Sequence, residues 1–565
     1  MTLKIPYGES NFKKVISGGY VYIDKTAYIA QLEAAGSYHF LLRPRRFGKS
    51  LLLSSLWYYY DIRHQAEFET LFGHLYIGQH PTPLKSSYQV LFMEFSGIDT
   101  RGGEPAIYQR FGEKIETSLQ DFLRRYGFAP EMAAEISLKS SPEAKLEHFF
   151  TLMSGCKILL LIDEYDHFAN AILADDLKLF QQIMGKGGFV RSFYETIKTA
   201  TQQGVVDRMF VTGVTPIMLD SMTSGFNIGQ NLSLTEAFNE AVGFTRQEVA
   251  SLLRPMAQAC PLDQGQLLAI VTDWYNGYRF HADAAETVYN ANMVLYFLNT
   301  FDYRRCAYPK KMLDDNIASD YGKILAMFSI GDRDANFAVL DELLNQGTVT
   351  AQQRRKFDFD KGFDRDDFIS LLAYMGFVTL RHETLAGEVF VIPNQVMREL
   401  YFQYFKVELE RRNQISIPDR ALLVAVETLA LRDDIQPLVT ELERVLQLLS
   451  NRDSLWLDEE HIKTILLALL YQSPAYFIQS EREMNRKYPD ILLLERSPYK
   501  VNHQHLIELK YSKKGDKEKG WESKKQEGVT QIQGYLQLPA IMALPKLSAW
   551  LLVTDGERVE ISKHP

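Results

Sequence analysis

A glycine, a lysine and a serine at residues 48–50 have the types and the spacing of a phosphate-binding loop. They end the segment RPRRFGKS, which follows the apolar run YHFLL and precedes the helix-like run LLLSSLWYYY. In such a loop, backbone N–H groups surround the phosphates, the lysine adds positive charge and the hydroxyl binds Mg²⁺. Gly48, Lys49 and Ser50 match the end of the pattern GxxxxGK[ST], but Arg43 stands in place of the first glycine. The segment favours nucleotide binding, with an ordinary helix start as the alternative.

The second chemical element is the run KILLLIDEYD, whose apolar part ends in Asp163 and Glu164. A buried parallel strand delivers such carboxylates to the carboxyl edge of its sheet, where ligands bind. There Asp163 would hold Mg²⁺ and Glu164 would polarise the attacking water. The alternative is a strand that simply ends in exposed acids. The loop and the acidic strand, in this order, predict a nucleoside triphosphatase.

A third set of residues lies near the C-terminus, where Pro489 and Asp490 precede Glu508 and Lys510. Side chains alternate along a strand, so Glu508 and Lys510 share one face. Asp490 and Glu508 would bind Mg²⁺ or Mn²⁺, and Lys510 would orient the water or stabilise the developing charge. This spacing is the PD-(D/E)XK nuclease pattern, which is loose enough to arise by chance.

Three neighbouring residues extend this third set. Glu483 lies in a polar segment before the first strand, where many such nucleases place another acid. Gln531 and Tyr535 are four residues apart, so they lie on one face of the expected helix. The Gln-x-x-x-Tyr pairing resembles a motif of RecB-like nucleases.

The elements that must position these residues follow an α/β pattern in the first 245 residues. Short apolar, β-capable runs alternate there with helical stretches, which is typical of a parallel sheet. The expected strands are 38–42, 89–96, 157–164 and 208–214. Thr245 and Glu248 have the spacing of a capping box, so a helix is expected to begin there.

The remainder of the chain is first helical and then returns to strands. Residues 366–405 have the order helix, hairpin, helix, as in a winged helix that reads DNA or in plain packing. Further helices are expected at 419–450, 458–472 and 527–537, and strands at 490–495, 505–512 and 549–554. We therefore expect a P-loop domain at 1–245, a helical lid and winged-helix-like region at 246–415, and a small α/β nuclease-like domain at 416–565.

The overall charge of the chain limits how it could bind nucleic acid. The formal net charge is −9 and the isoelectric point is about 5.8, which argues against a DNA-coating protein. Any contact with nucleic acid must therefore depend on local basic patches, such as residues 43–49. No signal peptide or membrane-spanning run is present in the sequence, so we expect a cytoplasmic protein without membrane contact.

Several segments together resemble the bacterial AAA-ATPase-like family, which is commonly joined to a C-terminal PD-(D/E)XK domain. These are YVYIDKTAYI (20–29), LLRPRRFGKSLLLSSL (41–56), LLIDEYD (160–166), VTGVTPI (211–217), SGFNIGQNLSL (224–234), VGFTRQEV (242–249) and WYNGYRF (274–280). The resemblance implies a P-loop fold in which Thr212 is a sensor residue. It also implies that Arg45 and Arg46 face phosphate or a neighbouring subunit. Arg279 is either a lid arginine or a structural partner for a carboxylate.

The family form also carries glycine and arginine shortly before the nuclease aspartate, where this chain has Lys487 and Tyr488. This departure makes Glu481 a competitor of Glu483. The combined expectation is an ATP-binding, ATP-hydrolysing protein with a Mg²⁺-dependent DNA nuclease domain. DNA is favoured over RNA, and a homo-oligomer is compatible with the family. The alternative is a nucleotide-switched module that binds nucleic acid or protein through a degenerate nuclease domain.

Overall fold

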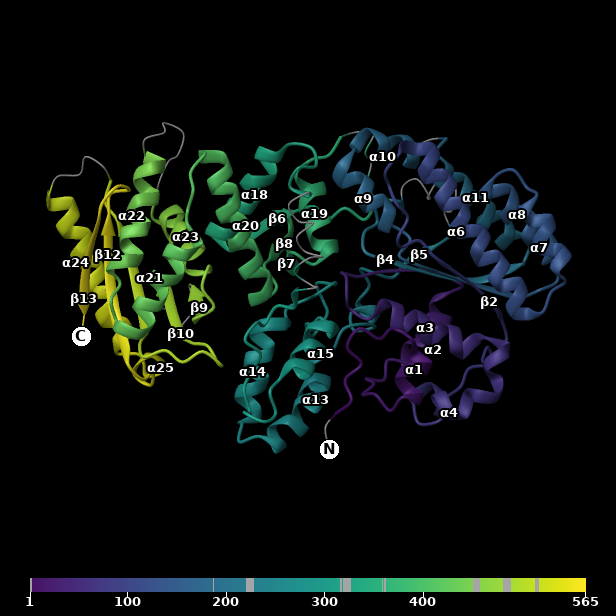
Figure 1. Cartoon of the computed structure of the whole chain (residues 1–565), viewed down its shortest axis with the longest axis horizontal. Coiled ribbons are helices and arrows are strands. Elements are labelled where there is room, and N and C mark those ends of the chain that lie inside the picture. The colour runs from purple at the N-terminus through teal and green to yellow at the C-terminus, as the bar shows by residue number, and fades with distance from the viewer. Residues whose placement is uncertain are drawn as a thin grey trace. The chain divides into compact units, whose positions relative to one another are not determined.

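A computed structural model describes residues 3–185, 187–219, 228–315, 318, 327–357, 359, 362–450, 458–480, 489–513 and 518–564. The chain divides into two compact units (Figure 1). The first contains Met1–Thr300, Asp314–Val339 and Thr348–Gln395, and the second contains Phe301–Leu313, Leu340–Gly347 and Val396–Pro565. The expected α/β class is confirmed, with a parallel sheet first, a helical middle and a small mixed sheet at the end. The three-part division at residues 245 and 415 stays a prediction.

The sheet of the first unit has five parallel strands in the order β2-β3-β4-β1-β5. The strands are β1 (Tyr38–Leu42), β2 (Gln89–Glu94), β3 (Ile158–Asp163), β4 (Val206–Gly213) and β5 (Gln230–Asn231). β4 pairs with β1 on one side and with β3 on the other. The carboxyl ends of these three strands therefore meet at one edge, which places the phosphate loop after β1 beside the acids that end β3.

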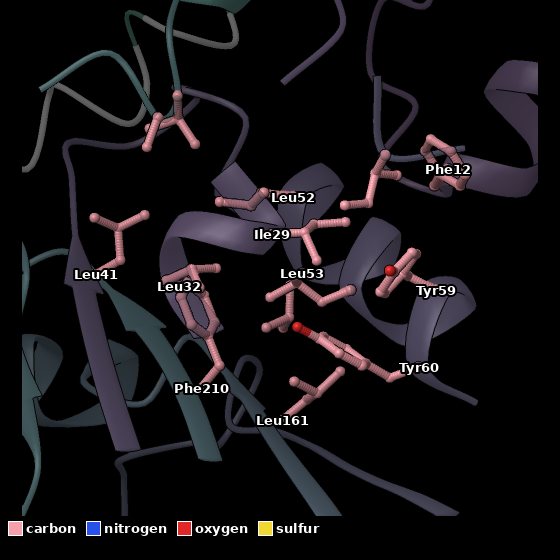
Figure 2. Close-up of a cluster of buried hydrophobic side chains, with 14 of the residues drawn as sticks. Phe12, Ile29, Leu32, Leu41, Leu52, Leu53, Tyr59, Tyr60, Leu161 and Phe210 are labelled. Carbon is pink, nitrogen blue, oxygen red and sulfur yellow. The ribbon is translucent and has the colours of Figure 1, made fainter. Parts of the chain in front are cut away.

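The helices of the first 202 residues surround this sheet. They are α1 (Phe12–Ser17), α2 (Ala27–Ala35), α3 (Lys49–Tyr60), α4 (Phe68–Phe72), α5 (Tyr76–Gln79), α6 (Gly103–Tyr126), α7 (Pro130–Ser137), α8 (Pro142–Leu152), α9 (His167–Asp175), α10 (Leu177–Met184) and α11 (Phe189–Gln202). Figure 2 shows the core beneath α3, where Leu53 and Tyr60 lie among Leu161 of β3 and Phe210 of β4. This buried packing fixes the start of α3, and with it the end of the phosphate loop, against the sheet.

Three helices follow the sheet: α13 (Arg246–Ala259), α14 (Gln264–Tyr275) and α15 (Ala291–Thr300). The expected capping box at the start of α13 is present. The Thr245 hydroxyl accepts a hydrogen bond from the backbone N–H of Glu248, and the Glu248 carboxylate accepts one from the N–H of Thr245. Lys25 also forms an ion pair with Glu248 at 2.8 Å, which fastens the N-terminal segment to this helix.

The expected order of helix, hairpin and helix is present, in α19 (Arg365–Met375), β7 (Thr379–Thr384), β8 (Gly387–Val391) and α20 (Gln395–Asn413). It is preceded by α18 (Arg333–Gln346) and β6 (Thr348–Ala351). The three strands form an antiparallel sheet in the order β6-β8-β7. A DNA-reading helix must present an exposed face to a groove. The side chains of Phe368, Ile369, Leu371 and Leu372 in α19 are instead buried. The structure thus favours the packing interpretation of this region.

The second unit carries a five-stranded mixed sheet in the order β13-β12-β11-β10-β9. Its elements are α20 (Gln395–Asn413), α21 (Asp419–Arg432), α22 (Gln436–Ser450), α23 (Glu459–Leu470), β9 (Tyr476–Ser480), β10 (Ile491–Glu495), β11 (Gln504–Tyr511), α24 (Glu518–Leu536), α25 (Pro539–Met542), β12 (Leu547–Thr554) and β13 (Val559–His564). β11 and β12 are parallel, and α24 connects them while packing on both. In the part of the chain that is described, every helix is too short or too polar to cross a lipid bilayer.

Candidate active sites

The phosphate loop runs from the end of β1 to the first turn of α3, as its sequence predicts. Gly48 has a φ of 98°, a left-handed conformation that favours glycine, and it directly precedes α3. Phe47 is fully buried, and its carbonyl accepts a hydrogen bond of 2.9 Å from the N–H of Gly243. Its ring also packs edge-on against Tyr278, with centroids 4.9 Å apart. The loop is therefore held from the side of the later helices as well as from the sheet.

Arg43, which replaces the first glycine of the pattern, has a structural role. Its side chain is buried, and its guanidinium donates hydrogen bonds to the carbonyls of Leu42, Ser233 and Phe238 at 2.6–2.9 Å. It also lies 3.9 Å from the centroid of the Phe280 ring. The guanidinium thus ties the loop to the segment after β5, and the missing glycine does not argue against a phosphate site.

Lys49 lies across the loop that it follows. Its ammonium donates hydrogen bonds of 2.9 Å to the carbonyls of Arg43 and Pro44. The side chain is only 8% exposed, and burial lowers the pKa of Lys49, while the carboxylates of Glu164 and Asp163 oppose this shift. A buried ammonium beside two carboxylates is a strong local charge for an anion that enters the loop.

Asp163 and Glu164 end β3 in two different environments. Asp163 is buried, and burial raises its pKa to about 6, although a hydrogen bond with Ser50 lowers it. Glu164 is more accessible and has a φ of 50°. Its Oε2 lies 2.7 Å from Nδ1 of His167, and this hydrogen bond is the main reason that the pKa of Glu164 falls to about 2. Ser50 and Asp163 thus lie together, as a Mg²⁺ site requires.

Asp166 fastens the loop that follows β4. Its carboxylate accepts hydrogen bonds from the N–H groups of Val214 and Thr215, and from the Thr215 hydroxyl. Thr212, the expected sensor, is fully buried next to this loop in β4, opposite Leu41 of β1. Its hydroxyl has no hydrogen-bond partner among the described residues. β4 therefore carries, close to its carboxyl end, a buried hydroxyl group without a partner among the described residues.

A cavity of about 420 Å³ opens beside the phosphate loop, within the first unit. Its polar wall contains Arg45, Arg46, residues 48–50, Glu164 and His167. Its apolar wall includes Tyr22, Val242, Phe244 and Leu252. The described residues that line it do not include Asp163, Thr212 or Arg279. A cavity lined by both cationic and apolar side chains can accept the phosphates and the base of a nucleotide.

Arg279 does not line the cavity beside the phosphate loop. Its N–H donates to the Thr379 hydroxyl at 2.8 Å, and its guanidinium donates to the carbonyl of Arg381 at 3.3 Å. Residues on the helical side that do reach the loop are Asn290 and Asn292. The Asn290 amide donates to the carbonyl of Arg45, and the N–H of Asn292 donates to the carbonyl of Arg46, each at 3.2 Å.

The second site lies on the sheet of the second unit. β10 and β11 are antiparallel with Ile491 opposite Ile507, so Asp490 lies opposite Glu508. Asp490 Oδ2 accepts a hydrogen bond of 2.8 Å from the N–H of Leu509. The strand pairing thus places the two acids together, as the alternation along the strand requires.

The buried Lys510 and the partly exposed Glu459 complete this cluster. Lys510 Nζ lies 3.0 Å from Glu508 Oε1 and 3.0 Å from Glu459 Oε1. Burial opposes a charged Lys510, but the carboxylates of Glu508, Asp490 and Glu459 raise its pKa above the usual value. Burial raises the pKa of Glu508 to about 8, with a contribution from Asp490. Burial likewise raises the pKa of Asp490.

Gln531 and Tyr535 lie on α24, which covers the same region of the sheet. A Cβ added to Gly528 of this helix would come within 3.2 Å of Lys510 Cγ, so helix and strand approach closely there. Burial raises the pKa of Tyr535, and the charge of Glu508 adds to this effect. Gln531 Oε1 is buried without a hydrogen-bond partner among the described residues. Glu483 and its competitor Glu481 lie outside the described residues.

The donor atoms of this cluster suit a hard divalent cation. Glu508 Oε2 is buried and has no hydrogen-bond partner in the described part of the chain, which leaves it available to a cation. Carboxylate oxygens are the ligands that Mg²⁺ and Mn²⁺ prefer. No group of three or more histidine, cysteine, aspartate or glutamate side chains is placed to hold a metal among the described residues. Asp490 and Glu508 therefore fit a metal that would retain several water ligands.

Two segments of the chain match the sequence models of known families. Residues 6–223 match the sequence model of a family described as predicted AAA-ATPase, and residues 457–564 match that of the PD-(D/E)XK nuclease superfamily. The chain joins an AAA-ATPase-like domain to a PD-(D/E)XK nuclease-superfamily domain. The predicted family resemblance is confirmed for both parts.

One curated relative and one solved structure are also similar to this chain. An "Uncharacterized protein in vnfD 5'region" from Azotobacter chroococcum mcd 1 is 27% identical over 302 residues, which are 53% of each protein. The match therefore spans about half the length of that relative. The Walker-type ATPase paby2304 of Pyrococcus abyssi is 12% identical, with a TM-score of 0.37 over 67% of this chain and 94% of that one. This score is too low for a detailed comparison of the two folds.

Some residues beside the predicted sites were not singled out from the sequence. In the AAA-ATPase-like domain they include His167, which contacts Glu164, and Asp166, which holds the loop after β4; both lie in the run DEYDH. In the nuclease-superfamily domain they include Glu459, which contacts Lys510. The sequence signal for Glu459 was present, because it follows the predicted N-cap Asp458 at the start of an apolar helix.

Proposed function

We propose that the AAA-ATPase-like domain binds and hydrolyses ATP with Mg²⁺ in the cavity beside the phosphate loop. Gly48 and Lys49 would bind the phosphates, and Ser50 and Asp163 would hold the metal. Glu164 would orient the attacking water. The observation that supports this proposal best is the position of the Lys49 ammonium on the carbonyls of the loop, beside the acidic end of β3.

The walls of the cavity support the same assignment. Arg45 and Arg46 line the cavity together with Lys49, and they would add positive charge around the phosphates. The aromatic and aliphatic side chains of Tyr22 and Val242 offer an apolar surface to the base. Thr212 has a buried hydroxyl without a described partner, so in this proposal it serves as the sensor in the neighbouring strand.

We also propose that the nuclease-superfamily domain hydrolyses phosphodiester bonds in DNA. Asp490 and Glu508 would hold Mg²⁺ or Mn²⁺, and such a metal activates water and polarises a phosphoryl oxygen. Lys510 would stabilise the negative charge that develops on the phosphate, and Glu459 would hold its ammonium in place. The observation that supports this proposal best is the cluster of Asp490, Glu508 and Lys510, in which Glu508 and Lys510 are buried and one Glu508 oxygen has no partner among the described residues.

Gln531 and Tyr535 would bind the substrate or the metal-bound water from the covering helix. The side-chain carbonyl oxygen of Gln531 has no hydrogen-bond partner among the described residues, and the charge of Glu508 contributes to the raised pKa of Tyr535. Both lie on α24, which connects the two parallel strands of the sheet. In this proposal ATP binding in the first domain regulates cleavage by the second.

The test is degradation of plasmid DNA, single-stranded DNA and RNA with Mg²⁺ or Mn²⁺, each with and without ATP. We expect metal-dependent cleavage of DNA by the wild type, none by Lys510→Met, and a rate that changes when ATP is added. The methionine keeps the apolar stem of the lysine and removes only the charge. Binding of nucleic acid without cleavage under every condition would contradict the catalytic proposal and support a nucleotide-switched binding module.

A further inference from the structure

His167 contacts the carboxylate that the proposed function assigns to water activation. Its Nδ1 lies 2.7 Å from Glu164 Oε2, at the first residue of α9. Both side chains line the cavity beside the phosphate loop. The two are three residues apart, so the contact is made within a single turn, and its geometry depends little on the rest of the fold.

Glu164 needs such a partner because of where the chain places it. It is the first residue after β3, and its positive φ of 50° marks a sharp turn into the next helix. Its side chain is 38% exposed, so packing does not restrict it to one rotamer. An accessible carboxylate that is not held samples several orientations, and fixing one of them costs conformational entropy.

Besides the carboxylate of Asp163, the other charges near Glu164 are two cations that a bound nucleotide would contact. Lys49 and Arg45 attract the Glu164 carboxylate, and both line the cavity at its phosphate end. Once phosphates are bound, these two side chains would turn to them. His167 is assigned to no phosphate, so in the proposed reaction its hydrogen bond to Glu164 is free to remain.

We propose that His167 is a positioning residue for Glu164, whose ring holds one carboxylate oxygen and leaves the other for the attacking water. This inference rests on the proposed ATP hydrolysis. Phosphoryl transfer through a loose transition state depends more on orienting the water than on removing its proton. A fixed carboxylate therefore serves the reaction better than a mobile one, even where the hydrogen bond makes it a weaker base.

The test compares His167→Ala with His167→Asn in the full chain. Because orientation alone is lost, we expect His167→Ala to lower kcat for ATP by on the order of tenfold. The KM and the Kd for ATP should stay unchanged within about twofold, since His167 makes no proposed contact with the bound nucleotide. In His167→Asn, the amide nitrogen occupies the place of Nδ1 and should restore most of the rate. His167→Phe, which keeps a ring but has no donor, should behave like the alanine variant and replaces it if that variant does not fold.

A double variant shows whether the loss of kcat in His167→Ala acts through Glu164. In Glu164→Gln, the added change His167→Ala should lower kcat by no more than about twofold, because residues that act as one unit are non-additive. The matched control is His148→Ala, which breaks another His–Glu pair of 3.2 Å, between α8 and α7, and should leave kcat unchanged.

Several results would overturn this inference. They are an unchanged or faster rate in His167→Ala, an equal loss in His148→Ala, a full additional loss in the Glu164→Gln background, and no rescue by asparagine. Failure of the proposed function looks different. If the wild type hydrolyses no ATP, both fail. If Glu164→Gln slows hydrolysis while His167→Ala does not, only the role of His167 is wrong.

Discussion

Glu459 Oε1 lies 3.0 Å from Lys510 Nζ, although 51 residues separate them in the chain. The other carboxylate oxygen of Glu459 accepts a hydrogen bond of 3.0 Å from the N–H of Tyr511. Glu459 therefore holds both the side chain of Lys510 and the backbone that follows it. These two hydrogen bonds join the start of α23 to the end of β11 beside the candidate metal site.

Replacing Glu459 by alanine should slow DNA cleavage by about a hundredfold, the cost of misplacing one charge-stabilising group. Lys510 would lose one of its two carboxylate partners and the strand end would lose an anchor. A plasmid-nicking assay at saturating Mg²⁺ measures the rate. Glu460→Ala is the matched control, because Glu460 is the exposed next residue of the same helical turn. Equal rates in the two variants would contradict the role given to Glu459.

Lys49→Ala should abolish ATP binding or weaken it severely, because it removes the ammonium held inside the phosphate loop. Lys157→Ala, at an exposed lysine before β3, should bind ATP like the wild type. Titration of a fluorescent ATP analogue measures both. Unchanged affinity in Lys49→Ala would exclude the phosphate-loop assignment.

Glu164→Gln should retain nucleotide binding and slow hydrolysis by on the order of 100-fold, because it keeps the shape of the side chain and loses the charge that polarises water. Single-turnover hydrolysis and analogue binding, measured on the same preparation, separate the two effects. A loss of affinity as large as that in Lys49→Ala would instead place Glu164 in nucleotide binding.

The local part of each site could be predicted from the sequence, since it depends on neighbouring residues. Glu508 and Lys510 share a face because side chains alternate along any strand, and Gly48 ends the loop because few other residues tolerate its backbone. The α/β pattern also predicts that Asp163 and the phosphate loop share the carboxyl edge of one sheet, but it does not give the order of the strands.

Contacts between distant segments could not be predicted in this way. The cap at Asp458 marks the start of α23, but nothing in the sequence indicates that this end faces Lys510. Arg279 has the residue type of a lid arginine, yet the packing of its segment against Thr379 directs it away from the cavity. Arg43 likewise binds carbonyls far along the chain.

Metal binding at the second site should release a proton near neutral pH. Burial and Asp490 raise the pKa of Glu508 to about 8, so near neutral pH a fraction of the metal-free molecules carries a proton on this carboxyl group. A cation binds the carboxylate form and must displace that proton. The apparent affinity for Mg²⁺ should therefore rise by up to about tenfold per pH unit below pH 8 and level off above it.

Calorimetry at pH 7 in two buffers with different protonation enthalpies measures this proton. Glu508→Gln has no carboxyl group to titrate and should show weaker binding with less proton release. Binding to the wild type without proton release, and with an affinity independent of pH between 6 and 8, would contradict the assignment of Glu508 as a metal ligand.

Asp490→Asn and Lys510→Met should both stop cleavage for different reasons. The asparagine removes the charge of a metal ligand, so Mg²⁺ affinity should fall and any residual cleavage should increase with metal concentration. The methionine substitution removes the ammonium group of Lys510, which is not a metal ligand. The affinity for Mg²⁺ should therefore stay near the wild-type value or rise. Loss of one group that stabilises the transition state costs about 100- to 1000-fold in rate. Calorimetry and plasmid nicking measure the two quantities separately.

Both variants should still bind DNA, because phosphate contacts from other basic side chains supply most of the non-specific affinity. Removing one partner of a buried ion pair costs about 3–5 kcal/mol, so thermal unfolding of Lys510→Met must be followed beside its activity. Lys525→Met is the matched control, because this half-exposed lysine pairs with Glu560 on the same domain. If Lys510→Met cleaves DNA like Lys525→Met, the ammonium takes no part in catalysis. If Asp490→Asn binds Mg²⁺ as tightly as the wild type, the metal lies elsewhere.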